Sequence, residues 1–298
     1  MLSRTGLARR AFTTTRTVLH NPSPNSGPAP FVLSESLPSA SSSASTSSPA
    51  PPTYPGHVKI NLFQRGLLAI GSAVMGLVDT SRHDMIAVLS ETTSGPFLER
   101  LRTKMRSTPA GRTILRERPR ITEYSIRLDH LSQLGPNSFG RKYYEWLKRN
   151  KVTPDTRDPV RYIDDPELAY IMQRYRESHD FYHVLLGFGV SLPAELVVKW
   201  FELSNFNLPV AFLSSTFGPL RLDRPERARL WDTYGTWALK AGAQAECLIA
   251  VEWEKEWNTD IDELRQRFRV ERPPIGFATF RKEERRLKAM REQEQSMS

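Results

Sequence analysis

The chain has 298 residues, of which 39% are hydrophobic and 25% charged, and its mean hydropathy is −0.46. These values describe a globular protein and exclude a bundle of membrane-spanning helices and a wholly disordered chain. The single cysteine, Cys247, excludes an internal disulfide framework and a zinc site built from several cysteines. The formal net charge of +9 is unevenly distributed, because residues 1–53 contain four arginines and one acid and the remainder carries +6.

The first fifty residues differ in composition from the rest. Residues 1–20 contain arginines and no acid, and as a helix they would place Leu2, Leu7 and Phe12 broadly opposite the arginines. This composition predicts a mitochondrial presequence, with a disordered basic N-terminus as the alternative. Residues 21–56 then hold nine of the 22 prolines and a serine-rich tract. Such a segment cannot bury enough apolar surface to offset its ordering entropy, so we predict a disordered linker.

Helix signals dominate the remaining chain and predict a single, mainly α-helical domain over residues 57–280, followed by a charged tail over residues 281–298. The most apolar stretch is residues 59–79. Its uncharged run, residues 66–78, has 13 residues and would be about 20 Å long as a helix, whereas a bilayer core requires roughly 20 residues. We expect a buried core helix here, and a lipid-contacting helix is the alternative.

Several helix starts carry a local signal. Asp165 followed by Pro166 is a cap and a first-turn proline, which predicts a helix that ends at Gly187. Another helix is predicted to start near Ser191. The apolar periodicity after Pro225 predicts one long helix over residues 225–257.

One cluster of metal-binding residue types stands out. His179 and His183 are four residues apart, a spacing that lets two imidazoles on a helix reach one ion, and Asp180 can share their face. The glycine break would fold the next helix back as an αα-hairpin and place Glu195 opposite the histidines. Two histidines, an aspartate and a glutamate therefore predict a divalent-metal site. The alternatives are an accidental surface cluster and an HD-type phosphohydrolase, which would need two further ligands.

Lys199 and Glu202 follow Glu195 at intervals of about one helical turn, so all three can share a face. A solvated ion pair between Lys199 and Glu195 is the simplest interpretation, although Lys199 could instead meet a substrate carboxylate. We expect Glu202 to be a second surface partner of Lys199 rather than a metal ligand.

The motif resembles that of the coenzyme Q biosynthesis protein 4 family. HDFYH at residues 179–183, followed after eleven residues by Glu195, matches the family pattern HDxxHx(11)E. The flanking text also matches, with DTRDPVRYIDDPELAYIMQRYRESHD before the motif, LPAELVVKWFE after it, PGHVKINLFQRGLLAIGSA at the start and FGPLRL near residue 220. The resemblance covers roughly residues 55–280.

The resemblance implies a mainly helical protein that holds zinc through His179, Asp180, His183 and Glu195. It implies a role in ubiquinone biosynthesis, by decarboxylation of 4-hydroxy-3-methoxy-5-polyprenylbenzoate at C1 to 2-methoxy-6-polyprenylphenol, with or without oxidation. It also implies peripheral attachment to the matrix side of the mitochondrial inner membrane, and organisation of a multi-subunit complex with the other coenzyme Q biosynthesis enzymes.

Two interpretations of the metal remain open. Four protein ligands would close a tetrahedral zinc shell, which is typical of a structural site and favours a non-catalytic, lipid-binding scaffold. Two histidines with a carboxylate also suit Fe²⁺ or another divalent metal. The polyprenylated substrate requires contact with lipid, for which residues 59–79 are the candidate, and burial of this helix in a homodimer is a further hypothesis. No nucleic-acid partner is expected, because the charge of +6 is modest and no basic–aromatic groove motif is present.

Overall fold

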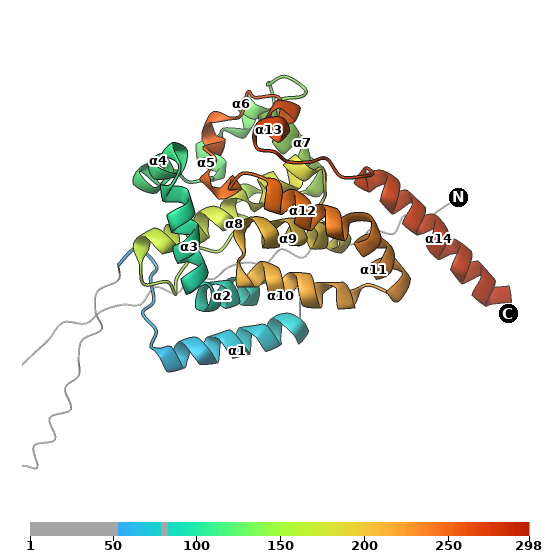
Figure 1. The fold of residues 1–298 in the computed structure, drawn as a ribbon, viewed down its shortest axis with the longest axis horizontal. Helices are drawn as coiled ribbons and strands as arrows, with labels where there is room; N and C mark the ends of the chain where they lie inside the picture. The colour runs from blue at the N-terminus through green and yellow to red at the C-terminus, as the bar shows by residue number, and fades with distance from the viewer. Residues whose placement is uncertain (1–52, 79–82, 298) are drawn as a thin grey trace, which may run out of the picture. The chain divides into compact units, whose positions relative to one another are not determined.

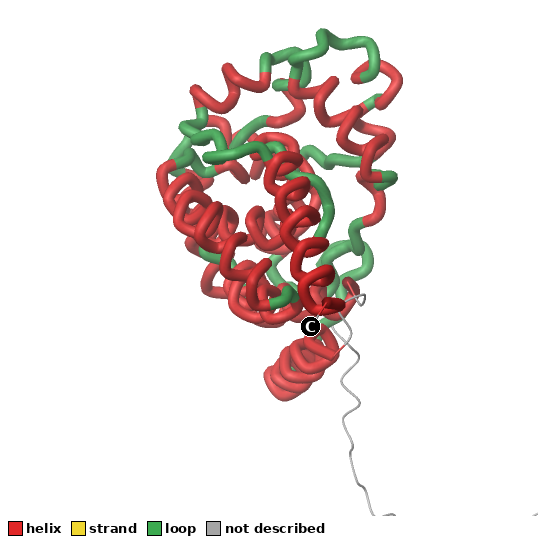
Figure 2. The backbone as a smooth tube through the Cα atoms, turned by 90° about the vertical axis from the view of Figure 1, so that its right-hand side faces the viewer, coloured by secondary structure: helices red, strands yellow, loops and turns green. Residues whose placement is uncertain are grey.

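The computed structural model describes residues 53–78 and 83–297, so the predicted presequence and the linker up to residue 52 lie outside the described residues. The described residues form a mainly helical domain without a strand, as predicted (Figures 1 and 2). The α-helices are α1 (Leu62–Val78), α2 (His83–Thr93), α3 (Gly95–Arg106), α4 (Pro109–Glu117), α5 (Glu123–Ile126), α6 (Leu128–Leu131), α7 (Phe139–Asn150), α8 (Pro166–Leu186), α9 (Leu192–Phe206), α10 (Pro209–Phe217), α11 (Arg224–Leu230), α12 (Thr236–Gln244), α13 (Ile261–Arg267) and α14 (Phe277–Met297).

The predicted start of α8 is confirmed. The Asp165 side chain accepts hydrogen bonds from the backbone N–H groups of Glu167 and Leu168, and Pro166 occupies the first turn. The cap satisfies two N–H groups that a helix start leaves without an intrahelical partner. The proline removes a third such donor at no cost, so the local sequence alone specifies where α8 begins.

Helix α8 is the buried centre of the domain. All of its residues from Leu168 to Leu186 are buried, and it packs against α3, α4, α7 and α9 (Figure 1). Many of these residues are polar or charged, and each buried charge on α8 is matched by an opposite charge from another segment. These pairs are Arg174–Glu254, Arg176–Glu91, Glu177–Arg120 and Asp180–Arg157. Pairing is what makes charge tolerable in a helix interior of this kind.

The predicted αα-hairpin is formed by α8 and α9. Gly187 ends α8 in the left-handed conformation at φ +81°, which glycine adopts without the steric cost that a Cβ would bring. The N–H groups of Gly187 and Phe188 both return to the carbonyl of His183. Helix α9 then begins five residues later with Pro193 in its first turn. The turn reverses the chain immediately after the two histidines and immediately before Glu195.

The expectation that residues 59–79 form a buried core helix is wrong. Helix α1 packs on one side against α2, but Leu62, Phe63, Leu67 and Ile70 are between 63% and 87% exposed. Its apolar residues therefore form an outward face rather than part of the core. None of the helices in the described ranges combines the length and the apolar character needed to cross a bilayer.

The long helix predicted over residues 225–257 is also wrong in its second half. The chain passes from α11 through a π-helical turn, η3 (Trp231–Gly235), into α12, which ends at Gln244. Two buried side chains then hold the following segment away from helical geometry. Asn205 donates to the carbonyls of residues 242 and 246 and accepts from the N–H of residue 248, while Arg174 donates to the carbonyls of residues 249 and 251. These carbonyls are bound by distant side chains instead of by N–H groups four residues later in a helix.

The predicted charged tail is helical and belongs to α14, which begins at Phe277. Phe280 is buried, and Arg281 pairs with Glu226 of α11. Glu284, also buried, pairs with Arg229 of the same helix. The first turns of α14 are therefore attached to the domain.

Candidate functional site

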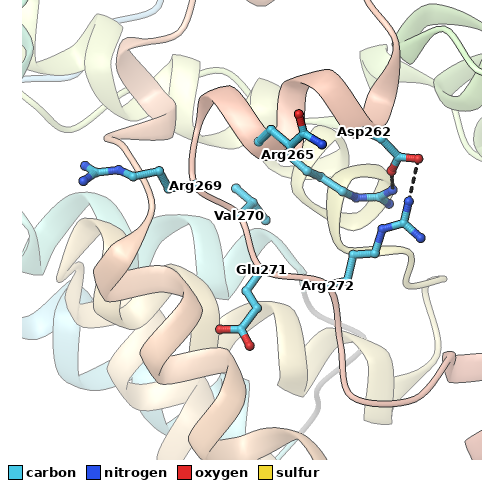
Figure 3. A pocket seen from close by; sticks show the side chains of 7 residues that line it. Asp262, Arg265, Arg269, Val270, Glu271 and Arg272 are labelled. Atoms are coloured by element: carbon cyan, nitrogen blue, oxygen red, sulfur yellow. Dashed lines mark hydrogen bonds and ion pairs between the residues drawn. The ribbon is translucent and has the colours of Figure 1, made fainter.

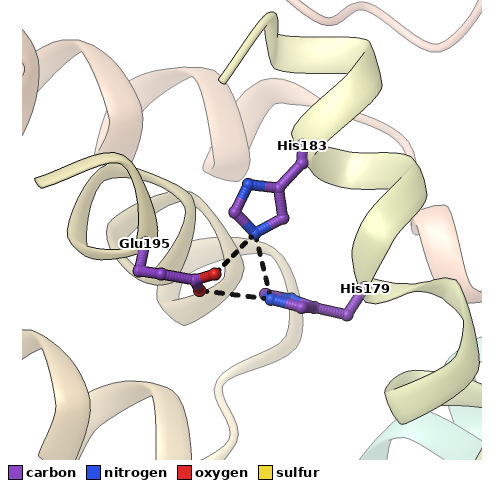
Figure 4. A group of neighbouring side chains, drawn as sticks. All are labelled: His179, His183 and Glu195. Carbon is purple, nitrogen blue, oxygen red and sulfur yellow. Dashed lines mark hydrogen bonds and ion pairs between the residues drawn. The ribbon is translucent and has the colours of Figure 1, made fainter. Parts of the chain in front are cut away.

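His179, His183 and Glu195 converge on one point between α8 and α9 (Figure 4). The two histidines lie one turn apart on α8, and Glu195 comes from the first turn of α9. The Nε2 atoms of His179 and His183 are 3.1 Å apart, and each lies 3.3 Å from a different carboxylate oxygen of Glu195. His183 is fully buried, His179 is nearly so, and the Glu195 side chain is 34% exposed. The group is thus enclosed on the α8 side and reachable from the Glu195 side.

The donor set fits a divalent metal ion. Two tetrahedral ligand atoms, each about 2.0–2.1 Å from a zinc ion, lie about 3.3 Å from each other. The two Nε2 atoms are separated by 3.1 Å, and each is 3.3 Å from one of the two Glu195 oxygens, so the group has the spacing of a metal site. Two imidazoles and one carboxylate are also the ligands of many Fe²⁺ sites, so the geometry does not select the metal. His179, His183 and Glu195 are therefore the residues that could hold it.

The electrostatic environment already resembles that of a ligand set. Partial burial raises the pKa of Glu195, but the charges of His183 and His179 and their hydrogen bonds outweigh it and hold the pKa well below its ordinary value of 4.5. Burial and the nearby Lys199 lower the pKa of His179, and the carboxylates of Glu202 and Glu195 raise it above 6.5 overall. The site therefore offers a carboxylate in its ionised form and an imidazole on which protons would compete with a metal.

Asp180, the fourth residue that the family resemblance implies as a ligand, is not part of this group. Its side chain is buried, and its Oδ1 accepts a hydrogen bond from Arg157 Nη2 at 2.5 Å. The Arg157 side chain comes from the loop before α8 and is 37% exposed. Asp180 as a metal ligand stays a prediction, and the structure gives it a different partner.

The expectation that Glu202 is a surface partner is wrong, because its side chain is completely buried. Its Oε1 lies 2.5 Å from His179 Nδ1, and its Oε2 accepts from Tyr175 and from Lys199. Lys199 thus pairs with Glu202 at 2.6 Å instead of forming the expected pair with Glu195. A signal for Glu202 was present in the sequence, since it follows Glu195 by seven residues, or about two helical turns on the same face.

Two surface pockets lie outside the His–Glu group. One, of about 340 Å³, is formed by α13 and the chain after it (Figure 3), and its lining includes Asp262, Arg265, Arg269, Val270, Glu271 and Arg272. Asp262 in this pocket is bonded to Arg265 and paired with Arg272. The other, of about 440 Å³, lies between α3 and the end of α9 and is more apolar. Neither is lined by His179, His183 or Glu195.

Comparison with known proteins agrees with the family resemblance. The family model described as coenzyme Q (ubiquinone) biosynthesis protein Coq4 matches residues 54–274. The mitochondrial ubiquinone biosynthesis protein COQ4 of Coprinopsis cinerea is 49% identical over 219 residues, which cover 74% of this chain and 75% of the relative. The corresponding mitochondrial protein of Schizosaccharomyces japonicus is 49% identical over 225 residues, covering 75% of this chain and 94% of the relative.

A solved structure shares the fold. A crystal structure of a protein from Nostoc punctiforme assigned to ubiquinone biosynthesis aligns with a TM-score of 0.56 at 21% identity, over 71% of this chain and 99% of that chain. The family model spans most of the described residues, and the fungal relatives are similar over three quarters of the chain. The chain belongs to the Coq4 family of coenzyme Q (ubiquinone) biosynthesis proteins.

Proposed function

We propose that the chain catalyses the C1 decarboxylation of 4-hydroxy-3-methoxy-5-polyprenylbenzoate to 2-methoxy-6-polyprenylphenol in ubiquinone biosynthesis, at a divalent metal held by His179, His183 and Glu195. The observation that carries the proposal is the convergence of these three residues while Asp180 is paired elsewhere. Three protein ligands leave a coordination position for a substrate, which is typical of catalytic rather than structural metal sites. The names of the fungal relatives, which place them in ubiquinone biosynthesis, support the substrate class.

The residues around the group suit an anionic substrate. In the reaction the bond between C1 and the carboxylate breaks, CO₂ leaves, and a proton takes its place on C1. A bound metal would act as a Lewis acid on a substrate oxygen. Arg157 is a partly exposed cation, which can bind the substrate carboxylate in place of Asp180. The released Asp180 carboxylate can then take up a proton from water at Oδ1 and pass it to C1, so that one solvent proton replaces the CO₂ that leaves.

We also propose that the chain works at the matrix face of the mitochondrial inner membrane, in contact with the other enzymes of the pathway. The exposed apolar face of α1 supports this location, because contact with lipid would remove several large side chains from water. Such contact would also bring a polyprenyl tail to the domain. The same face supports the alternative function, a non-catalytic scaffold with a structural metal, and a second copy of the chain could cover it instead.

Bound metal and released CO₂, measured together on the purified full chain, test the proposal. The wild type and His183→Ala would each receive the substrate in lipid vesicles with Zn²⁺ or Fe²⁺, under nitrogen and under ¹⁸O₂. His130→Ala, which removes an exposed histidine outside the site, is the matched control. We expect His183→Ala alone to lose metal and CO₂ release while it keeps the helical circular dichroism of the wild type.

The remaining outcomes separate the alternatives. Stoichiometric metal without CO₂ under any condition would replace the decarboxylase with the scaffold. Incorporation of ¹⁸O at C1 of the product would show that an oxygen atom, rather than a proton, replaces the carboxylate. CO₂ release that survives in His183→Ala would remove the metal group from the mechanism.

A further inference from the structure

We propose that Glu202 is a positioning residue of the metal centre, which fixes the tautomer of His179 so that the lone pair of Nε2 faces the metal. The inference rests on the proposed metal site. It concerns a side chain that would touch neither the ion nor the substrate and that acts through His179.

The two carboxylates on one face of α9 hold the His179 ring between them. Glu195 Oε2 lies 3.3 Å from Nε2, and Glu202 Oε1 lies 2.5 Å from Nδ1. The two glutamates are seven residues apart, so the helix presents them about two turns apart on the face toward α8. One end of the imidazole therefore meets the partly exposed carboxylate of the metal group, and the other end meets a carboxylate that is fully buried.

The other neighbours of Glu202 leave Nδ1 only the role of donor. Glu202 Oε2 accepts from the Tyr175 hydroxyl at 2.7 Å and from Lys199 Nζ at 2.6 Å. An ion-paired carboxylate has only acceptor atoms, so the proton between Oε1 and His179 belongs to Nδ1. Lys199 Nζ lies 3.4 Å from Nδ1, much farther than Oε1, and its short contact is with Glu202. With the proton on Nδ1, the neutral ring has its lone pair on Nε2, at the point where the three donor atoms converge.

His183 gives an internal contrast. Its Nδ1 is buried and has no hydrogen-bond partner among the described residues. Of the two histidines, only His179 therefore has a buried carboxylate that can fix its tautomer among the described residues. Metal-bound histidines usually donate their second N–H to a carboxylate or carbonyl, and loss of that partner typically lowers metal affinity by 10–100-fold.

Two double variants separate hydrogen bonding from charge. Glu202→Leu with Lys199→Met removes the acceptor and both charges, so that no buried lysine is left without a partner. Glu202→Gln with Lys199→Met has the same net charge as the leucine variant, but its amide oxygen can still accept a hydrogen bond from Nδ1 of His179. Glu284→Gln removes another buried carboxylate, which lies in α14 and accepts from Arg229 of α11, and serves as the control.

Each protein is studied as the full chain in two measurements. The first is the ¹⁵N spectrum of the metal-free protein with labelled histidine at about pH 9, well above the usual imidazole pKa of about 6.5, with His179→Gln to assign the signal. The second is Zn²⁺ affinity by competition with a chromophoric chelator. We expect His179 to carry its proton on Nδ1 in the wild type, the glutamine variant and the control. In the leucine variant we expect mixed tautomers and a 10–100-fold loss of affinity, largely restored in the glutamine variant.

The outcomes distinguish this inference from the function on which it rests. A wild type that binds no Zn²⁺ removes the metal site and with it the role of Glu202. A wild type that binds Zn²⁺ as tightly as the leucine variant, or whose His179 is protonated on Nε2, overturns only the role of Glu202. Equal losses in the leucine and glutamine variants would assign the effect to charge and likewise overturn the hydrogen-bond role.

Discussion

Helices α8 and α1 reverse the usual relation between composition and burial. Helix α8 contains the HDFYH motif, two arginines and a glutamate within its buried length, yet nearly all of it is inaccessible to water. Helix α1 has no charged residue after Arg65, and six of its large apolar side chains are exposed, namely Leu62, Phe63, Leu67, Ile70, Val74 and Met75. The comparison shows that burial in this domain follows the availability of partners more than hydropathy. Helix α8 finds its partners within the chain, whereas one face of α1 has no partner among the described residues.

The largest effect should come from breaking a buried pair of α8. Arg174 is completely buried and bonds Glu254 and the carbonyls of Ile249 and Val251. Arg174→Met leaves these acceptors without their donor, and we expect the free energy of unfolding to fall by about 3–5 kcal/mol. Urea denaturation measures it. As a control, Arg286→Ala removes a solvent-exposed pair with Glu283 and should leave the urea midpoint unchanged. An unchanged midpoint in Arg174→Met as well would mean that packing alone holds α8.

A bound metal ion should raise the free energy of unfolding by slightly less than Arg174→Met lowers it. Because His179 and His183 lie on α8 and Glu195 on α9, an ion joins the hairpin only in the folded state. At a free Zn²⁺ concentration of 100 times Kd, we expect a gain of about 2.7 kcal/mol in unfolding free energy, removed by a chelator. Thermal unfolding of the wild type and His183→Gln with and without Zn²⁺ checks it. An equal shift in both proteins would place the ion elsewhere.

The contribution of His179 to the stability of the metal-free protein and the stabilisation by Zn²⁺ should change in opposite directions with pH. The pKa of His179 is raised above 6.5 in the folded state, so in the metal-free protein its contribution to stability is complete below pH 6.5 and is lost as pH rises through the folded pKa. Metal binding requires an unprotonated Nε2, so the stabilisation by Zn²⁺ should grow over the same range. Unfolding free energies at several pH values, with and without Zn²⁺, would give diverging curves. Parallel curves would contradict the assignment of His179 as a ligand.

The smallest effect on stability is expected in α1. Leu67→Gln and Ile70→Gln change exposed side chains, and each should alter the unfolding free energy by no more than about 0.5 kcal/mol. The matched change in α8, Leu185→Ala, removes a completely buried side chain and should cost about 2–5 kcal/mol. The α1 variants should nevertheless weaken sedimentation with anionic lipid vesicles. Unchanged sedimentation together with a lost dimer would identify a second copy of the chain as the partner of α1.

The sequence predicted those features that depend on neighbouring residues. The Asp165 cap, the turn at Gly187 and the i, i+4 histidines are local signals, and the hairpin that brings Glu195 to them follows from the turn. The end of α12 could not be predicted in this way, because the carbonyls that leave the helical pattern are bound by Asn205 and Arg174, which lie tens of residues earlier.

The metal group shows the same limit. The spacing of HDFYH placed Asp180 on the face of the histidines, but the partner that engages it, Arg157, comes from a loop with no periodic signal. Glu202 carried a signal, its two-turn distance from Glu195, but a carboxylate beside a lysine on a helix is usually a solvated pair. Its burial depends on the packing of α9 against the rest of the domain, which spacing along one helix does not reveal.

The segment held by Asn205 and Arg174 also contains the only thiol of the chain. Cys247 is buried, and burial raises the pKa of its thiol, so in the closed state it is protected both sterically and chemically from alkylating reagents. Its labelling rate therefore reports how often this segment opens, with no second cysteine to confuse the signal. The segment contacts α8 through Arg174, and the first proposed metal ligand, His179, lies five residues further along that helix. A bound metal ion that stabilises α8 would therefore lower the labelling rate of Cys247, which needs no spectroscopic label.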